Sequence, residues 1–169
     1  NCEILLSPIN TKNSLDYMAC IMLLSEASKL LLQDEERYQI FNDLEECIKT
    51  IKVSETPLMA ALIFLTRVLK LSGYEFEVNE CVVCGSKKDI VAFSFNDGGF
   101  ICRNCMNEST QKDLSKEEMV LIRSAFNAKE MSFVSQNYSR EKVITILQKL
   151  SIFVQDSFGI TLKSISLLK

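Results

Sequence analysis

Four cysteines, arranged as two Cys-x-x-Cys pairs, are the residues of this chain best suited to chemistry. The pairs are Cys81/Cys84 and Cys102/Cys105, and 17 residues separate them. Two such pairs at this spacing are typical of a zinc site with four thiolate ligands. Gly85, directly after the first pair, permits the backbone conformation that such a turn usually needs. The sequence therefore predicts one bound Zn2+ ion with all four cysteines as its ligands.

A β-hairpin is predicted between the two pairs. Residues 90–95 have the composition of a strand, residues 96–99 (Asn-Asp-Gly-Gly) are typical of a turn, and residues 100–101 lead back. Such a hairpin would bring the two pairs together at one end, where a single metal ion can bind both.

The ligand set also predicts what the metal does. Four thiolates fill a tetrahedral zinc ion and leave no position for water or substrate. The chain contains no histidine, which excludes a His-containing catalytic site and the commonest general base near neutral pH. We therefore expect a structural zinc and no enzymatic activity. Its binding free energy, roughly 10–16 kcal/mol in isolated zinc peptides, is ample to hold a hairpin too small to have its own core.

Three other uses of these cysteines are less well supported. Disulfides suit a secreted, cysteine-dense chain, but the other three cysteines show no matching pattern and no export signal precedes them. A thioredoxin-like redox site needs one Cys-x-x-Cys motif in a βαβ setting. An iron–sulfur cluster would accept the same ligands, although two pairs around a hairpin favour zinc.

Length and composition indicate one compact domain with an inset zinc module. The 169 residues are 47% hydrophobic and 24% charged, which is ordinary for a globular protein. The longest apolar run, residues 58–65, is far shorter than the ~20 residues that cross a membrane, so we expect no membrane association. Free cysteines, a thiolate site and the lack of a signal peptide predict a cytoplasmic protein. Because the chain starts at Asn1 without a methionine, we expect a fragment of something longer.

The net charge of −3 is unevenly distributed along the chain. Residues 26–55 are acidic, whereas residues 81–105 and 106–169 are weakly basic. A domain dedicated to nucleic acids is usually basic overall. Any DNA affinity is therefore expected to be local or to come from another domain.

The elements that must position the cysteines are predicted to be helices. The expected fold is mainly α: a helical bundle-like domain with an inserted four-cysteine zinc knuckle and β-hairpin module. Residues 1–80 form the first part of the helical domain, residues 81–105 the zinc-binding module, and residues 106–169 the second helical part.

Two helices are predicted in the first part. Ser14 can cap a helix that runs to about Leu32, and residues 17–24 are apolar nearly all round, so we expect them to be buried. Asp34 can cap the next helix. Apolar residues recur there at helical spacing: Ile40, Phe41, Leu44, Cys47, Ile48 and Ile51. Cys20 and Cys47 are expected to be small buried core residues.

A third helix has the clearest boundaries. Thr56 is the predicted N-cap, Pro57 the first helical residue, and Gly73 follows the last turn. Four leucines line one side: Leu58, Leu62, Leu65 and Leu69. We expect a central core helix that leads almost directly into Cys81, so that the zinc module is anchored to the core.

Two further helices are predicted after the module. Residues 115–118 (Ser-Lys-Glu-Glu) form a capping box that opens a helix to about Asn127. Ser139 starts a long helix that ends at Gly159, and residues 162–169 are expected to form a short packed tail. The long helix carries an apolar stripe that we interpret as core: Val143, Ile146, Leu147, Leu150, Phe153, Val154 and Phe158.

Taken together, these residues resemble the C-terminal part of the RecO family of bacterial recombination mediators. The likeness rests on residues 69–74 (LKLSGY) leading into residues 81–85 (CVVCG), on Phe93-Ser94 followed by Gly98-Gly99, and on the second cysteine pair. It continues at residues 158–159 and 162–164, and weakly at residues 17–26. Phe76 stands where the family often has proline, a departure expected to matter little.

The resemblance implies a role in recombinational repair by the RecF pathway. RecO proteins bind single- and double-stranded DNA, anneal complementary strands, and bind RecR and the C-terminal tail of the single-stranded-DNA-binding protein. They also help to load RecA. The family begins with an oligonucleotide-binding (OB) barrel, and nothing in this chain resembles one. We therefore expect weak DNA binding by this chain alone. Several family members lack the cysteines, which agrees with a structural metal.

Site residues beyond the cysteines are candidates by charge and position. Lys87, Lys88 and Arg103 are the predicted DNA contacts, because the module would hold them near one another; a solvated loop face is the alternative. Arg67 and Lys70, the lone charges on the third helix, are the predicted contacts for the carboxylate of the tail peptide.

Two other functions stay open. One is a zinc-ribbon adapter that binds only protein and has no effect on strand annealing. The other is a metalloenzyme of the zinc deaminase type, which needs an open coordination position and a glutamate near the first ligand. Residues 81–83 (Cys-Val-Val) lack that glutamate.

Overall fold

The computed structural model describes residues 15–53, 57–131 and 138–168. Within them the chain forms six α-helices, a two-stranded antiparallel sheet and a 3-10 helix, which confirms the mainly α prediction. The elements are α1 (Leu15–Leu31), α2 (Asp34–Gln39), α3 (Phe41–Val53), α4 (Pro57–Leu71), β1 (Ile90–Ser94), β2 (Gly99–Cys102), α5 (Lys116–Phe126), α6 (Arg140–Phe158) and η1 (Lys163–Leu167). The predicted caps Ser14 and Thr56 lie outside the described residues.

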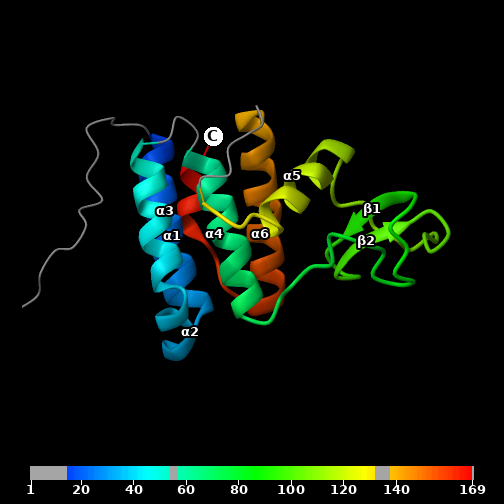
Figure 1. The fold of residues 1–169 in the computed structure, drawn as a ribbon, viewed down its shortest axis with the longest axis horizontal. Helices are drawn as coiled ribbons and strands as arrows, with labels where there is room; N and C mark the ends of the chain where they lie inside the picture. Colours follow the sequence, from blue (N-terminus) through cyan, green and yellow to red (C-terminus); the bar gives the residue numbers. More distant parts are fainter. Residues whose placement is uncertain (1–14, 54–56, 132–137, 169) are drawn as a thin grey trace, which may run out of the picture.

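Helix α4 is the centre of the fold, as the sequence predicts. It contacts α1, α3, α5 and α6, and Figure 1 shows it between α1 and α3 on one side and α5 and α6 on the other. Pro57 is its first residue, and Gly73 follows it with a φ of +89°, where a residue without a Cβ is favoured. The side chains of Leu58, Leu62 and Leu65 are at most 4% exposed. Each such burial stabilises the fold by roughly 1.5–3 kcal/mol.

Helix α1 packs on one side only, which corrects one expectation. Tyr17, Cys20 and Leu24 are buried against the rest of the bundle, but Met18 and Met22 are 55% and 44% exposed. These two methionines are four residues apart and so lie on the same side of the helix. The prediction that residues 17–24 are buried all round is therefore wrong for that side.

The helix predicted from Asp34 is divided into α2 and α3. Ile40 lies between them and is 1% exposed, and the backbone hydrogen bonds from Ile40 to Glu36 and from Leu44 to Ile40 continue across the break. The N-cap of α2 is Gln33 and not Asp34, because the Gln33 amide donates to the Glu36 carboxylate at 2.8 Å.

Phe41 and Cys47, both on α3, differ in how deeply they are buried. Phe41, expected in the core, is the first residue of α3 and is 51% exposed. Cys47, six residues later, is fully buried and its sulfur approaches the Ala60 carbonyl oxygen at 3.4 Å. Cys20 is buried as well, so the prediction for both cysteines is confirmed.

Helix α5 begins with the predicted capping box. The Ser115 hydroxyl accepts from the Glu118 amide at 3.3 Å, and the Glu118 carboxylate accepts from the Ser115 amide at 2.7 Å. Helix α6 ends at Gly159, whose φ of +68° is the left-handed C-cap conformation.

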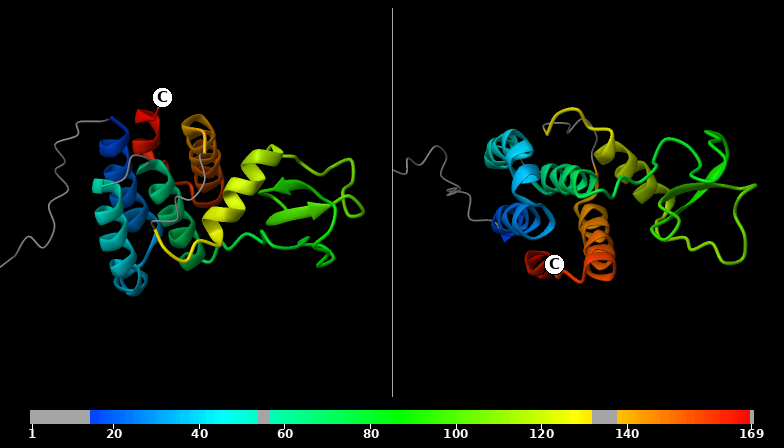
Figure 2. Two further views of the ribbon diagram at one scale, coloured as in Figure 1. Left: turned by 45° about the horizontal axis from the view of Figure 1, so that its top comes forward. Right: turned by 90° about the horizontal axis from the view of Figure 1, so that it is seen from below.

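The C-terminal tail packs on α1, far away in sequence. The Glu26 carboxylate accepts from the amide and the hydroxyl of Ser164 at 2.9 and 2.6 Å. Leu162, Ile165 and Leu168 are buried. Figures 1 and 2 show η1 beside α1, so the first and last described elements close one side of the bundle.

Residues 81–105, which we call the cysteine module, project from one end of the molecule beyond α5 (Figures 1 and 2). The helices and η1 together form the helical body. Strands β1 and β2 pair in antiparallel register, with Phe93 opposite Phe100 and Ser94 opposite Gly99. Phe93 and Phe100 belong to the same buried apolar cluster as the helices, which confirms that the module is anchored to the core.

Candidate metal centre

The first cysteine pair is shaped by a tight turn. The Gly85 amide donates to the Cys81 carbonyl oxygen, and the Cys81 amide donates to the Ser86 carbonyl oxygen, both at 2.8 Å. Gly85 has a φ of +70°, which a residue with a side chain rarely adopts. The glycine predicted after the pair is therefore required by the turn.

The second pair continues directly from β2. Cys102 is the last residue of that strand, and its carbonyl oxygen accepts from the amides of Cys105 and Met106 at 3.1 and 3.0 Å. The first pair is tied to the same strand, because the Val82 amide donates to Phe100 at 2.8 Å. The hairpin thus brings the two turns together.

The four sulfur atoms form one compact cluster. All of them lie within 4.8 Å of one another, and those of Cys84 and Cys102 are 3.7 Å apart. Four Zn–S bonds of about 2.3 Å at tetrahedral angles place the sulfurs about 3.8 Å apart, whereas a disulfide requires about 2.05 Å. The donor set and its spacing fit a tetrahedral thiolate site for a metal ion.

The surroundings of Cys81 favour its thiolate form. Burial raises the pKa of this thiol, but the backbone N–H groups of Cys102, Cys84 and Val83 outweigh burial and lower the pKa to about 6. One of these donors, the Cys102 amide, lies 3.3 Å from the Cys81 sulfur. By contrast, hydrogen bonds with the sulfurs of Cys84 and Cys102 raise the pKa of Cys105 to about 12. Metal binding would therefore release protons from this site.

The three candidate DNA contacts lie on the cysteine module and are exposed. The Lys87 ammonium is 4.0 Å from the Glu80 carboxylate, and its side chain is 75% exposed. Lys88 is exposed beside Asp89, whose carbonyl oxygen accepts from the Arg103 amide at 2.9 Å. All three side chains are exposed to solvent, and their assignment to DNA stays a prediction.

The two candidate contacts for the tail peptide are already engaged. The Arg67 guanidinium pairs with Asp43 and donates to the Lys129 carbonyl oxygen at 2.8 Å, which ties α4 to α3 and to the segment after α5. The Lys70 ammonium pairs with Glu75, and both side chains are exposed. The structure thus gives Arg67 a place in the framework of the body.

An aromatic cluster joins the module to the body, and Phe76 is its centre. The Phe76 ring is 5% exposed, and its centroid lies 4.9–5.8 Å from those of four rings, one on β1, one directly after β1, and one each on α5 and α6. Those rings belong to Phe93, Phe95, Phe126 and Phe153. No prediction from the sequence gave Phe76 this position at the centre of the cluster.

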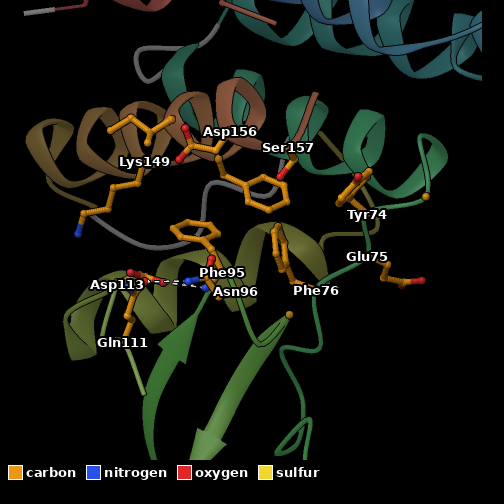
Figure 3. A pocket seen from close by; sticks show the side chains of 14 residues that line it. Tyr74, Glu75, Phe76, Phe95, Asn96, Gln111, Asp113, Lys149, Asp156 and Ser157 are labelled. Atoms are coloured by element: carbon orange, nitrogen blue, oxygen red, sulfur yellow. Dashed lines mark hydrogen bonds between the residues drawn. The ribbon is translucent and has the colours of Figure 1, made fainter. Parts of the chain in front are cut away.

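A groove beside this cluster is absent from the sequence predictions. It measures about 740 Å³ and lies between α6 and the hairpin (Figure 3). No motif marks it, because its lining comes from four separate segments of the chain. The one available signal was the number of aromatic residues in and before the hairpin.

Within residues 15–53, 57–131 and 138–168, no helix is both long and apolar enough to cross a bilayer.

Comparison with known proteins finds one matching family model and several similar proteins. A family model described as "Recombination protein O C terminal" matches residues 12–165. The chain is 29% identical over 115 residues to the DNA repair protein RecO of Syntrophomonas wolfei, covering 67% of this chain and 46% of that protein. It is 33% identical over 107 residues to that of Bacillus pumilus (61% and 41%) and 24% identical over 126 residues to that of Bacillus subtilis (74% and 49%). The chain spans about half the length, or less, of these relatives.

Proposed function

This chain belongs to the family of recombination protein O C-terminal domains, and from that premise we propose that it serves DNA repair and recombination as the metal-stabilised helical part of a mediator protein. The observation that carries the proposal is the family match over residues 12–165, which includes both the helical body and the cysteine module. The relatives are named for DNA repair.

The metal at the four cysteines is proposed to be a structural Zn2+ ion. It would join the two turns and hold the hairpin against the aromatic cluster. All four positions around such an ion would be occupied by sulfur, so we infer that the chain works by binding and not by catalysis.

The proposed activity is the handling of DNA strands. Annealing requires no covalent step, because neutralisation of phosphates by cations supplies salt-sensitive affinity. Lys87, Lys88 and Arg103 are exposed on the module and are the proposed local contacts. Most of the affinity is proposed to come from an OB barrel, which nothing in this chain resembles.

The proposed partners are those of the RecF pathway: RecR, the C-terminal tail of the single-stranded-DNA-binding protein, and RecA during loading. Of the two cations proposed for the tail peptide, Lys70 is the more accessible, with a side chain 59% exposed against 21% for Arg67. Arg67 is better explained by its bonds within the body.

A chimera tests the proposal. The N-terminal part of the Bacillus subtilis relative is joined to this chain and produced in a strain that lacks its own RecO. Survival after DNA crosslinking, and annealing of complementary oligonucleotides by the purified chimera, are both expected to exceed those of the N-terminal part alone. Metal analysis of the same protein is expected to give one zinc per chain.

The outcomes separate the candidate functions. A chimera that binds zinc but neither restores survival nor accelerates annealing would favour a zinc-ribbon adapter that binds only protein. This chain alone is expected to bind single-stranded DNA weakly, and a sub-micromolar dissociation constant in a fluorescence titration at physiological salt would contradict the division of labour between barrel and body.

A further inference from the structure

The groove between α6 and the hairpin has an apolar floor formed by both parts of the molecule. Phe95 from the hairpin stacks on Phe153 from α6, with ring centroids 5.5 Å apart. Tyr74, which packs on Phe158 at 4.5 Å, closes one end and is 37% exposed. Ile152 also lines the groove and is 61% exposed. Figure 3 shows the rings of Phe95 and Phe76 between α6 and the strands, with Tyr74 to one side.

The rim of the groove is negatively charged. Its lining contains three carboxylates, Glu75, Asp113 and Asp156, and one cation, Lys149. The Lys149 ammonium is bonded to the Glu118 carboxylate at 2.9 Å. Glu75 likewise pairs with Lys70, which lies outside the lining. When both pairs are set aside, Asp113 and Asp156 leave the groove negatively charged.

Two carboxylates of the lining differ in their contacts within the described residues: Asp113 is held by hydrogen bonds, whereas Asp156 is not. Asp113 is fixed, because its carboxylate accepts from the Phe95 amide at 2.7 Å while its own amide donates to Phe93 at 2.9 Å. Asp156 is exposed on α6, and its carboxylate makes no hydrogen bond or ion pair with the described part of the chain. Asn96 and Gln111, which bond to each other at 3.1 Å, add amide oxygens to the same end.

We propose that this groove binds a basic segment of a partner protein, with an arginine or lysine side chain lying along the aromatic floor. The methylene stem of such a side chain would cover Ile152 and Phe153, and its charged head would reach Asp156 and Asp113. Arginine has five N–H donors and no acceptor, which matches a rim rich in carboxylate and amide oxygens. Aromatic rings add a favourable electrostatic contact with the cation.

The same charges disfavour other occupants. An acidic peptide or a nucleic-acid phosphate would be repelled by the carboxylates of Asp113 and Asp156. The lining offers only Lys149 as a cation, and Lys149 is already paired with Glu118. The inference extends the proposed function by giving the chemistry of one protein partner. If the chimera fails to support repair while a basic peptide still binds here, the proposed function fails and this inference stands.

Fluorescence anisotropy of the zinc-loaded chain tests the proposal with three labelled, C-terminally amidated peptides. The first contains two arginines and one leucine among glycines and serines; the others replace both arginines by glutamine or by glutamate. The arginine peptide is expected to bind most tightly. Asp156→Lys is expected to weaken it about fivefold to tenfold, whereas Glu35→Lys, the same charge change on exposed α2, leaves binding within about twofold.

A second pair of variants tests the apolar floor. Ile152→Ser is expected to weaken the arginine peptide by at least about threefold, and Val120→Ser, at a side chain 56% exposed on α5 outside the groove, is expected to leave it unchanged. Chemical-shift changes should centre on α6 and the hairpin. Tighter binding of the glutamate peptide, equal effects of Asp156→Lys and Glu35→Lys, or no binding of any peptide would overturn the proposal.

Discussion

In the helical body, α4 is buried along nearly its whole length by four surrounding helices, so the sequence itself supplies the core. In the cysteine module, the residues of both cysteine turns are largely exposed, and few apolar side chains other than those of the hairpin are buried. Burial of apolar surface can hold the body, whereas the module is expected to depend on the proposed metal ion and on the aromatic cluster. The two regions should therefore respond differently to the same perturbation.

Removal of the metal should give the largest difference between them. Cys102→Ser, or chelation, is expected to eliminate a contribution of order 10 kcal/mol and to unfold the turns and the hairpin, while the helices remain. Hydrogen exchange should become fast at residues 81–105 and stay slow in α4. Cys20→Ala, at a buried cysteine of the body, is the control and should keep one metal ion per chain. Equal loss of protection in both regions would show that the module and the body fold as one unit.

The aromatic cluster should provide the next largest effect. Phe76→Ala removes a ring that contacts four others and is expected to cost about 3–5 kcal/mol. The lost contacts join the two regions. Calorimetry of the variant should therefore show two thermal unfolding transitions, one for the body and one for the module. Tyr38→Ala, at a side chain 87% exposed, should change stability by less than about 0.5 kcal/mol. A single transition in the Phe76 variant would place the coupling elsewhere.

The close approach of the Glu77 backbone to Gly99 in the hairpin should give a smaller change in stability. A Cβ at Gly99 would lie 2.3 Å from the Glu77 carbonyl oxygen, and the φ there is +152°. Gly99→Ala is therefore expected to cost about 2–4 kcal/mol, measured by the denaturant midpoint of the zinc-loaded protein. Gly98→Ala is the matched control: nothing lies within 4 Å of its Cβ, so only the strain of a φ of +83°, about 1–2 kcal/mol, remains. Equal costs at both positions would contradict the steric explanation.

The difference between the two regions also explains what the sequence could reveal. The cysteine turns, Pro57 at the start of α4 and the capping box of α5 are set by local chemistry, so their residue types and spacing were enough to predict them. The cysteine cluster follows from the same spacing together with the hairpin. Local signals fail where packing decides: the apolar pattern of α1 does not say that Met18 faces outward, and no glycine or proline marks the break at Ile40.

The groove and the role of Phe76 depend on the relative placement of body and module. Residues 74–76, the hairpin, residues 111–113 and α6 approach one another only in the folded chain. A single sequence gives no register between such distant segments. Sequence reasoning placed Phe153 in a core stripe and Phe93 in a strand, but it could not predict that both contact Phe76.

The pairing of α5 with α6 supplies the smallest expected effect, and it depends on pH. Burial raises the pKa of Glu118, but the Ser115 amide and the Lys149 ammonium outweigh burial and lower it. A carboxylate with a lowered pKa stabilises the folded state at neutral pH, and this contribution is lost as the pH falls through the folded-state pKa. Glu118→Gln should cost about 1–2 kcal/mol near pH 7, and its difference from the parent protein should shrink below about pH 4. Glu117→Gln, at an exposed neighbour paired with Lys142, should cost less than about 0.5 kcal/mol at either pH. A cost for Glu118→Gln that is the same at both pH values would contradict this explanation and would mean that Glu118 stabilises the fold by packing and not by its charge.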